Sequence, residues 1–265
     1  MTQEWFAKYP GLDFERQDAG VLLMTINRPD KMNATTARDH YGLSRVWYDI
    51  EDDEAVRVVV VTGAGDAFSA GGELEWIGTM VHNYEGLKPA MREAGHIVYR
   101  MTECSKVIVS AINGVAVGAG LAVALMADIS IMNEDARLTD GHMRLGVAAG
   151  DHAVILWPML CGLAKAKLYL LTSDFIDGRT ADNIGLVSKA VPADQVLPEA
   201  LNIAAKIASG PQDAVSWTKR ALNLWVKQAA PAFDASLAFE MLNFMGPDAA
   251  EGQAALAEKR KPNFD

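Results

Sequence analysis

The sequence predicts an α/β fold whose final third is all helical. Residues 57–63 (RVVVVTG) and 107–112 (VIVSAI) are runs of apolar, mostly β-branched residues, typical of strands covered on both faces. The second run leads through Asn113-Gly114 into an apolar helix from about Gly118, and residues 128–132 predict a third strand. Strand, glycine loop, helix and strand in this order are expected of a layered α/β fold.

The segments around these strands complete the α/β part. Residues 12–15 and 21–26 flank a short Asp-Ala-Gly turn and predict a β-hairpin. A helix is predicted over about residues 35–52. Residues 66–72 indicate a turn-rich loop, and residues 78–94 indicate a mobile polar segment.

The final third carries apolar residues at three- and four-residue spacing, which predicts helices over residues 163–171, 197–207 and 214–225. The change from mixed α/β to all-α character after about Val191 is the one boundary signal. We therefore divide the chain into an α/β core (residues 1–191) and a C-terminal helical region (residues 192–265).

Composition limits the possible partners. The 265 residues, half of them apolar, are enough for a large buried core. The chain has 24 basic and 34 acidic residues, a formal charge of -10, which disfavours nucleic acid and anionic membranes as partners. A local basic pocket still allows an anionic small molecule.

Cysteine usage and the N-terminus favour a cytoplasmic protein. Cys104 and Cys161 lie far apart with no metal-like spacing, so we expect two reduced thiols and no metal. The first residues do not show the pattern of a signal peptide. The longest apolar stretch, residues 115–126, is too short to span a bilayer.

Several motifs occur in a fixed order along the chain. The main ones are NRPDKMNA at residues 27–34, RVVVVTG at 57–63 with AFSAGGEL at 67–74, and AINGVAVGAG at 111–120 with ADI at 127–129. Shorter matches follow at residues 185–187, 218–219, 251–252 and 259–264. This ordered set resembles the crotonase (enoyl-CoA hydratase/isomerase) superfamily over nearly the whole chain.

The resemblance implies a crotonase-like spiral of ββα units followed by a C-terminal helical region that supports trimerisation. It also implies a homotrimer or a hexamer, built as a dimer of trimers. The implied substrate is a coenzyme A thioester of the kind met in fatty acid metabolism. Coenzyme A would be part of that substrate, with no permanently bound cofactor.

Two glycine-rich loops are the candidate anion-stabilising elements. A thioester that loses an α-proton places negative charge on its carbonyl oxygen, and two preorganised backbone N–H groups can stabilise that oxygen by about 3–4 kcal/mol each. The resemblance assigns these donors to Gly72 and to Ala119, where the family usually has glycine. The alternative is that the glycines merely permit tight strand-to-helix turns.

The same resemblance places Lys31, Met32 and Ala70 near the nucleotide and pantetheine of coenzyme A, together with Gly72. Lys31 is equally well explained as an ordinary surface lysine.

The two glutamates that hydratases of this family use are both absent. Matching the motifs residue by residue puts Ala122 at the first position and His142 at the second. Ordinary two-glutamate hydration is therefore not expected.

His142 is instead a candidate general base, because neutral imidazole is a good base near pH 7 when a carboxylate fixes its tautomer. Asp151, nine residues on, is the candidate carboxylate, and this pattern resembles the superfamily's β-diketone hydrolases, which cleave a C–C bond by a retro-Claisen reaction. Alternatively, His142 is only a hydrogen-bonded residue in a drifted pocket, and Asp151 is an N-cap of the helix that begins near His152.

Glu240 is a further candidate acid or base from the C-terminal helices; otherwise it lies on a solvated helix face. His40 and Tyr41 are expected on a helix surface, with the acyl pocket as the alternative.

Three functions stay open. The first is an acyl-CoA lyase or isomerase that works through a thioester enolate. The second is a C–C bond hydrolase that uses His142 and Asp151 on a β-diketone. The third is a coenzyme A-binding protein without catalytic activity.

Overall fold

A computed structural model describes residues 5–264 and contains two sheets. The larger sheet has the strand order β1-β2-β3-β5-β7-β10, antiparallel between β1 and β2 and parallel elsewhere. Its strands are β1 (Leu12–Arg16), β2 (Val21–Ile26), β3 (Val58–Gly63), β5 (Val107–Ile112), β7 (Ile129–Asn133) and β10 (Lys189–Val191). The predicted hairpin and the three predicted buried strands are confirmed.

The smaller sheet has the order β4-β6-β8-β9, and its first three strands run parallel. The strands are β4 (Ala67–Ser69), β6 (Val115–Val117), β8 (Arg137–Thr139) and β9 (Ile176–Asp177). Parallel pairing brings the carboxyl ends of β4, β6 and β8 to the same edge. The segments that follow these three strands therefore lie side by side.

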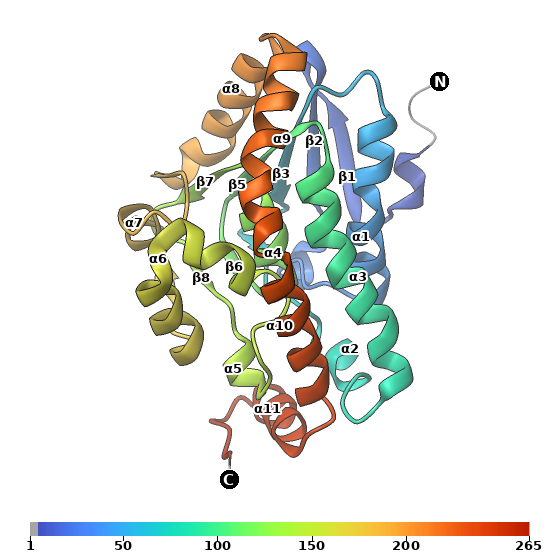
Figure 1. The fold of residues 1–265 in the computed structure, drawn as a ribbon, viewed down its shortest axis with the longest axis vertical. Helices are drawn as coiled ribbons and strands as arrows, with labels where there is room; N and C mark the ends of the chain where they lie inside the picture. The colour runs from blue at the N-terminus through green and yellow to red at the C-terminus, as the bar shows by residue number, and fades with distance from the viewer. Residues whose placement is uncertain (1–4, 265) are drawn as a thin grey trace.

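The helices surround both sheets (Figure 1). They are α1 (Ala37–Asp52), α2 (Leu74–Gly78), α3 (Tyr84–Glu103), α4 (Gly118–Met126), α5 (His142–Leu145), α6 (Ala153–Thr172), α7 (Gly178–Asn183), α8 (Val196–Ala208), α9 (Gln212–Gln228), α10 (Ala230–Asn243) and α11 (Pro247–Ala257). Short 3-10 helices cover Phe6–Lys8, Asp18–Gly20, Pro29–Lys31 and Ala193–Gln195.

The order of elements confirms the spiral of ββα units. A strand of the larger sheet is followed by a strand of the smaller sheet and then by a helix in β3-β4-α2, β5-β6-α4 and β7-β8-α5. In each ββα unit, the strand of the smaller sheet therefore ends at the same edge of that sheet. This repetition brings residues from distant parts of the sequence to that edge.

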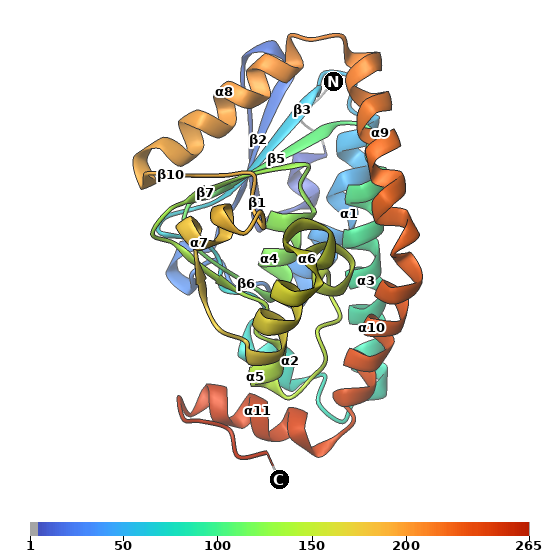
Figure 2. The ribbon, with the colours of Figure 1, turned by 60° about the vertical axis from the view of Figure 1, so that its left-hand side comes forward.

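Strand β3 shows why the larger sheet forms. All six of its residues are buried, and its side chains alternate between two apolar clusters. Val59 and Val61 belong to the main core with α1 and α3, whereas Val58 and Val60 pack with the alanines of α8. Figure 2 shows α8 on one side of this sheet and α1 and α3 on the other.

Residues 78–94 correct one expectation. The predicted mobile polar segment is wrong, because α3 begins at Tyr84 and the side chain of Asn83 caps it by accepting a hydrogen bond from Gly86 N. The helix buries a narrow stripe that includes Leu87, Ala90 and Ala94, so most of its first turns are polar. The predicted loop at residues 66–72 likewise contains strand β4.

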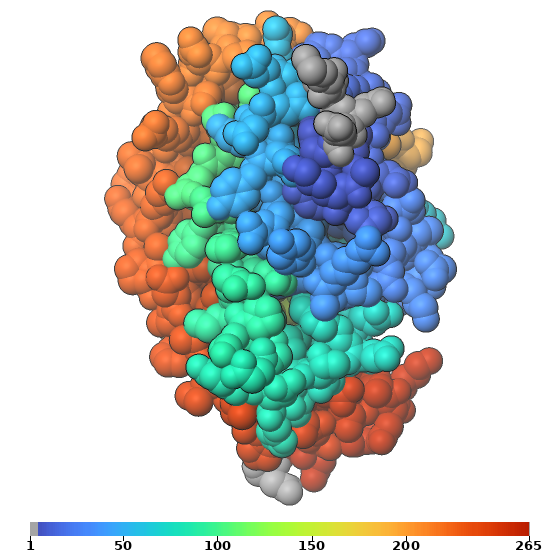
Figure 3. Space-filling model, turned by 90° about the vertical axis from the view of Figure 1, so that its right-hand side faces the viewer, coloured from blue at the N-terminus to red at the C-terminus, as the bar shows by residue number. Residues whose placement is uncertain are grey.

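The C-terminal helices pack onto the core. Lys219 of α9, which is buried, forms an ion pair at 2.7 Å with Asp128, beside the start of β7. Figure 3 shows the C-terminal residues against the region of α2 and α3, where Gln253 Nε2 donates a hydrogen bond to Leu74 O. The proposed boundary at residue 191 stays a prediction.

Helix α6 starts ten residues before the predicted residue 163 and bends at Gly162. Among residues 5–264 it is the one helix long and apolar enough, by length and composition only, to cross a membrane. Its first half buries Ile155 and Trp157 in the main core.

Candidate active site

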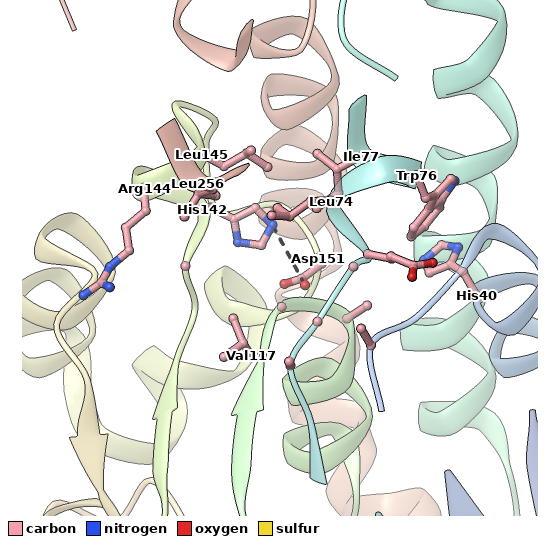
Figure 4. Close-up of a pocket in the computed structure, with 18 of the residues that line it drawn as sticks. His40, Leu74, Trp76, Ile77, Val117, His142, Arg144, Leu145, Asp151 and Leu256 are labelled. Atoms are coloured by element: carbon pink, nitrogen blue, oxygen red, sulfur yellow. Dashed lines mark ion pairs between the residues drawn. The ribbon is translucent and has the colours of Figure 1, made fainter. Parts of the chain in front are cut away.

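A cavity of about 570 Å³ opens at the carboxyl ends of β4, β6 and β8. The segments after these strands line it, and further walls come from residues 31–34 and from helices α1, α2, α3, α10 and α11. Figure 4 shows His142 and Asp151 facing each other across it, with Trp76 and His40 to one side and Arg144 directed away. The volume suits a small organic molecule.

The two glycine-rich loops touch at the base of the cavity. Ser69 of β4 and Ala116 of β6 are paired in register, so the loops after them start side by side. Gly71 has φ +87°, and a Cβ there would lie 3.0 Å from Val117 O. A side chain at residue 71 would therefore push the loops apart, and glycine permits their close approach.

The amides of Gly72 and Ala119 both belong to cavity-lining residues. Within residues 5–264, no protein acceptor takes a hydrogen bond from either N–H, whereas Ala70 N donates to Met32 O and Gly71 N donates to Ser69 Oγ. Ala119 is the second residue of α4, where helix amides have no partner within the helix. Its φ is not positive, so alanine fits this position without strain.

Behind these loops, His142 is buried among three carboxyl groups. Its Nδ1 donates to Asp140 Oδ2 at 2.9 Å. Its Nε2 lies 3.6 Å from Glu240 Oε1 and 3.9 Å from Asp151 Oδ2. Burial would lower the pKa of His142, but the negative charges of the three carboxylates outweigh burial and raise that pKa well above its ordinary value.

This geometry corrects two expectations. The carboxylate that holds the far nitrogen of His142 is Asp140, not Asp151, which lies on the Nε2 side with Glu240. The raised pKa of His142 favours the imidazolium form over the neutral base that the sequence led us to expect. Asp140 was missed, although it directly follows strand β8 and lies only two residues before His142, and that proximity is the one signal that could have indicated it.

Glu240 reaches this cluster from α10 and is buried, so the expectation of a solvated helix face is wrong. Burial raises the pKa of Glu240 above its ordinary value, although the cationic His142 lowers it. Within residues 5–264, its Oε2 is buried without a hydrogen-bond partner. A Cβ on Gly150 would collide with this carboxylate, so Gly150 leaves the room that Glu240 occupies.

Asp151 bridges two histidines. Its Oδ1 accepts a hydrogen bond from His152 Nδ1 at 2.6 Å, and Oδ2 faces His142. Burial would raise the pKa of Asp151, but His152 and His142 lower it to about 2. The N-cap alternative is wrong, because the N-cap of α6 is His152 and no side chain caps that helix.

Asp140, Asp151 and His152 also offer possible metal ligands within 4.8 Å of one another. Their hydrogen bonds to His142 and to each other explain their grouping, and we assign no metal ligand among them.

The residues expected near coenzyme A lie together at the cavity. Lys31, Met32 and Ala70 all line it, and Met32 is 57% exposed at its mouth. Ala122, which the resemblance places at the first glutamate position, is buried in α4 and is not among the described residues that line the cavity. The roles assigned to these residues, and to Gly72, Ala119, His142, Asp151 and Glu240, stay predictions.

His40 does not lie on a helix surface as expected. It is buried, lines the cavity, and its Nδ1 lies 2.9 Å from Glu93 Oε2. Tyr41 is exposed, as expected. The sequence did not indicate Glu93 of α3, or the apolar cavity wall formed by Trp76 of α2 with Met241 and Phe244 at the end of α10. No local sequence pattern connects these three helices.

The sequence matches a model of the enoyl-CoA hydratase/isomerase family over residues 16–265. A crotonyl-CoA hydratase of Syntrophomonas wolfei is 32% identical over 265 residues, covering 97% of this chain and 98% of that protein.

Two solved structures share the fold. An enoyl-CoA hydratase/isomerase from Mycobacterium paratuberculosis has a TM-score of 0.88 and 33% identity, covering 92% of this chain and 97% of that chain. A β-diketone hydrolase from the cyanobacterium Anabaena, bound to (S)-3-oxocyclohexyl acetic acid, has a TM-score of 0.84 and 27% identity, covering 91% and 96%.

Proposed function

Because the chain belongs to the enoyl-CoA hydratase/isomerase family, the crotonase superfamily, we propose that it stabilises an enolate on the amides of Gly72 and Ala119. The proposed reaction is hydrolytic cleavage of the C–C bond between the two carbonyl groups of a β-diketone. Water is the one co-reactant, since no electrons leave the substrate.

The observation that carries this proposal is the acid–base cluster beside the two loops. Ala122 and His142 stand where a two-glutamate hydratase has its carboxylates, and His142 and Glu240 lie 3.6 Å apart in the cavity. A buried carboxyl with a raised pKa next to an imidazolium is a matched base and acid. The similarity to a β-diketone hydrolase supports this assignment.

In the proposed reaction, the Glu240 carboxylate takes a proton from water, and the hydroxide oxygen forms a bond to one carbonyl carbon. The C–C bond then breaks, and its electron pair forms the enolate of the second carbonyl, whose oxygen accepts hydrogen bonds from Gly72 and Ala119. His142 gives its Nε2 proton to the enolate carbon. The proton on Glu240 passes to His142, and the carboxylic acid product ionises in water.

The cavity wall indicates a compact apolar substrate. Trp76, Ile77, Met241 and Phe244 line it, and its apolar surface suits a ring or a short branched chain. A cyclic β-diketone meets both requirements, because it combines an apolar ring with two carbonyl groups.

Turnover of a substituted cyclic 1,3-diketone tests the proposal, followed as loss of its absorbance and appearance of the keto acid. Glu240→Gln and His142→Asn are expected to lower kcat by a factor of about 10²–10⁴, because each removes a group that transfers a proton. Glu85→Gln, at an exposed residue, is the control and should match the wild type. Hydration of crotonyl-CoA at an ordinary enzymatic rate, with no diketone turnover, would contradict the proposal.

A second candidate is an acyl-CoA hydratase or isomerase. It is favoured by Lys31 and Met32 at the mouth of the same cavity and by the similarity to a crotonyl-CoA hydratase. Coenzyme A protection against thermal unfolding that is lost in Lys31→Met would support it, since a ligand that binds only the folded state raises its stability.

A further inference from the structure

Behind Asp151, two fully buried side chains continue the hydrogen-bonded chain away from the cavity. Trp157 Nε1 donates to His152 Nε2 at 3.3 Å, and His152 Nδ1 lies 2.6 Å from Asp151 Oδ1. His152 and Trp157 each have 0% exposed surface. Neither residue lines the cavity, so neither can touch a substrate bound there.

The donor and acceptor roles in this chain follow from the indole. An indole nitrogen can only donate a hydrogen bond, so His152 Nε2 must be the acceptor. The ring proton of a neutral His152 is therefore on Nδ1, from which it is donated to Asp151. Asp151 Oδ2 is left to face His142 at 3.9 Å.

We propose that Trp157 and His152 are positioning residues, with Trp157 holding His152 in its neutral Nδ1–H tautomer so that His152 keeps Asp151 anionic and aimed at His142. The inference rests on the proposed acid–base role of His142 and Glu240. It adds to the proposed site two positioning residues that do not line the cavity.

The charges around His152 explain why its tautomer matters. Asp151 contacts the ring directly, and a carboxylate oxygen of Asp140 lies within 4.8 Å of the same group of atoms. His142 and Glu240 lie on the other side of Asp151 from His152. In the Nε2–H tautomer, His152 would turn a lone pair instead of an N–H toward Asp151, and Asp151 would lose its hydrogen bond at 2.6 Å. Trp157 disfavours that tautomer because its N–H donates to Nε2.

Trp157→Phe removes the N–H donor and keeps an aromatic ring. In the full-length chain labelled with ¹⁵N-histidine, wild-type His152 should show the Nδ1–H tautomer. In the variant the Nε2–H tautomer should appear. The variant should lower kcat by about tenfold to a hundredfold, with KM changed less than about threefold.

Trp47→Phe is the matched control. Trp47 is equally buried in the main core, but within residues 5–264 its Nε1 has no hydrogen-bond partner. The control should lose stability without any change in the tautomer of His152 or in kcat. An equal change in both variants would overturn the proposal.

A second pair of variants tests His152 without altering Trp157. The amide nitrogen of asparagine takes the place of Nδ1, so His152→Asn keeps a donor for Asp151, whereas His152→Gln displaces it toward Nε2. We expect His152→Asn to keep kcat within about threefold, and His152→Gln to lower kcat by about tenfold to a hundredfold with little change in KM. Equal kcat values for the two variants would contradict the proposal.

The NMR measurement separates failure of this inference from failure of the proposed function. The tautomer of His152 is read from the resting protein, whichever substrate it turns over. An Nε2–H tautomer in the wild type overturns the inference even if β-diketones are cleaved. Absence of diketone turnover alongside the expected Nδ1–H tautomer and its loss in Trp157→Phe overturns the proposed reaction and supports the hydrogen-bonded chain.

Discussion

Three carboxyl groups around one imidazole set the chemistry at the residue scale. Asp140 holds Nδ1 of His142, and Asp151 and Glu240 face Nε2. Together they raise the pKa of a ring whose pKa burial alone would lower. This favours the charged form of the residue that gives up a proton in the proposed reaction.

The pH dependence of the reaction follows from these shifts. Activity should rise with pH as Glu240 loses its proton, above its ordinary range because burial raises its pKa. It should fall when His142 loses its proton, well above its ordinary pKa. Asp140→Asn removes a charge that raises the pKa of His142, so the alkaline limb should move down by about one to three pH units. Kinetics of kcat/KM across pH measure this, and an unmoved alkaline limb would mean that another group titrates.

The sequence predicted which residues line the site more accurately than it predicted which residues contact one another there. Motif position alone led to Gly72, Ala119 and His142, which all line one cavity. It could not reveal Asp140 as the partner of His142, because that contact depends on where β8 ends. Nor could it pair His40 with Glu93, which lies on another helix with no shared local pattern.

At the scale of elements, the start of α4 has a direct test. Ala119 lies in the first turn, where proline is tolerated because the amide has no partner within the helix. Ala119→Pro removes one proposed donor and should lower kcat by a factor of about 10²–10³. Ala119→Gly keeps the N–H and should stay close to the wild type. Circular dichroism must show equal helix content in both variants, and equal kcat values would remove Ala119 from the proposed mechanism.

Strands were predicted more reliably than helices because their signal is continuous. The run of valines in β3 is buried on both faces and leaves no other interpretation. Helix α3 buries only a stripe of its surface, so the polar residues at its start looked like a loop. Helix α6 was predicted too short, because its apolar first half is divided from the rest by Gly162.

At the scale of the whole molecule, the ion pair of Lys219 and Asp128 joins α9 to the larger sheet. Lys219→Met should lower the free energy of unfolding by about 1.5–3 kcal/mol, because Asp128 loses the charged hydrogen-bond partner that the buried Lys219 supplies. The deficit should shrink at acid pH, where Asp128 becomes neutral. Urea denaturation measures both effects.

The exposed pair of Lys88 and Glu85 supplies the control for that measurement, and Lys88→Met should leave stability unchanged. Equal stability of Lys219→Met and the wild type at neutral pH would show that α9 is held by its apolar contacts alone.

The ββα spiral was implied by the ordered motifs, and the repeated order of strands confirms it. The placement of the last helices was not predictable in the same way. Their apolar spacing indicates that they are amphipathic but not which surface they cover. Only the structure shows that α10 supplies a wall of the cavity and carries Glu240 into it.

The route by which Glu240 enters the cavity has a consequence for the protein during its synthesis. Ribosomes release a chain from its N-terminus, so both glycine loops and His142 emerge well before α10 does. A nascent chain that lacks α10 has neither the wall formed by Met241 and Phe244 nor the proposed water-activating carboxylate. The complete pocket is therefore available only after the last helices have left the ribosome.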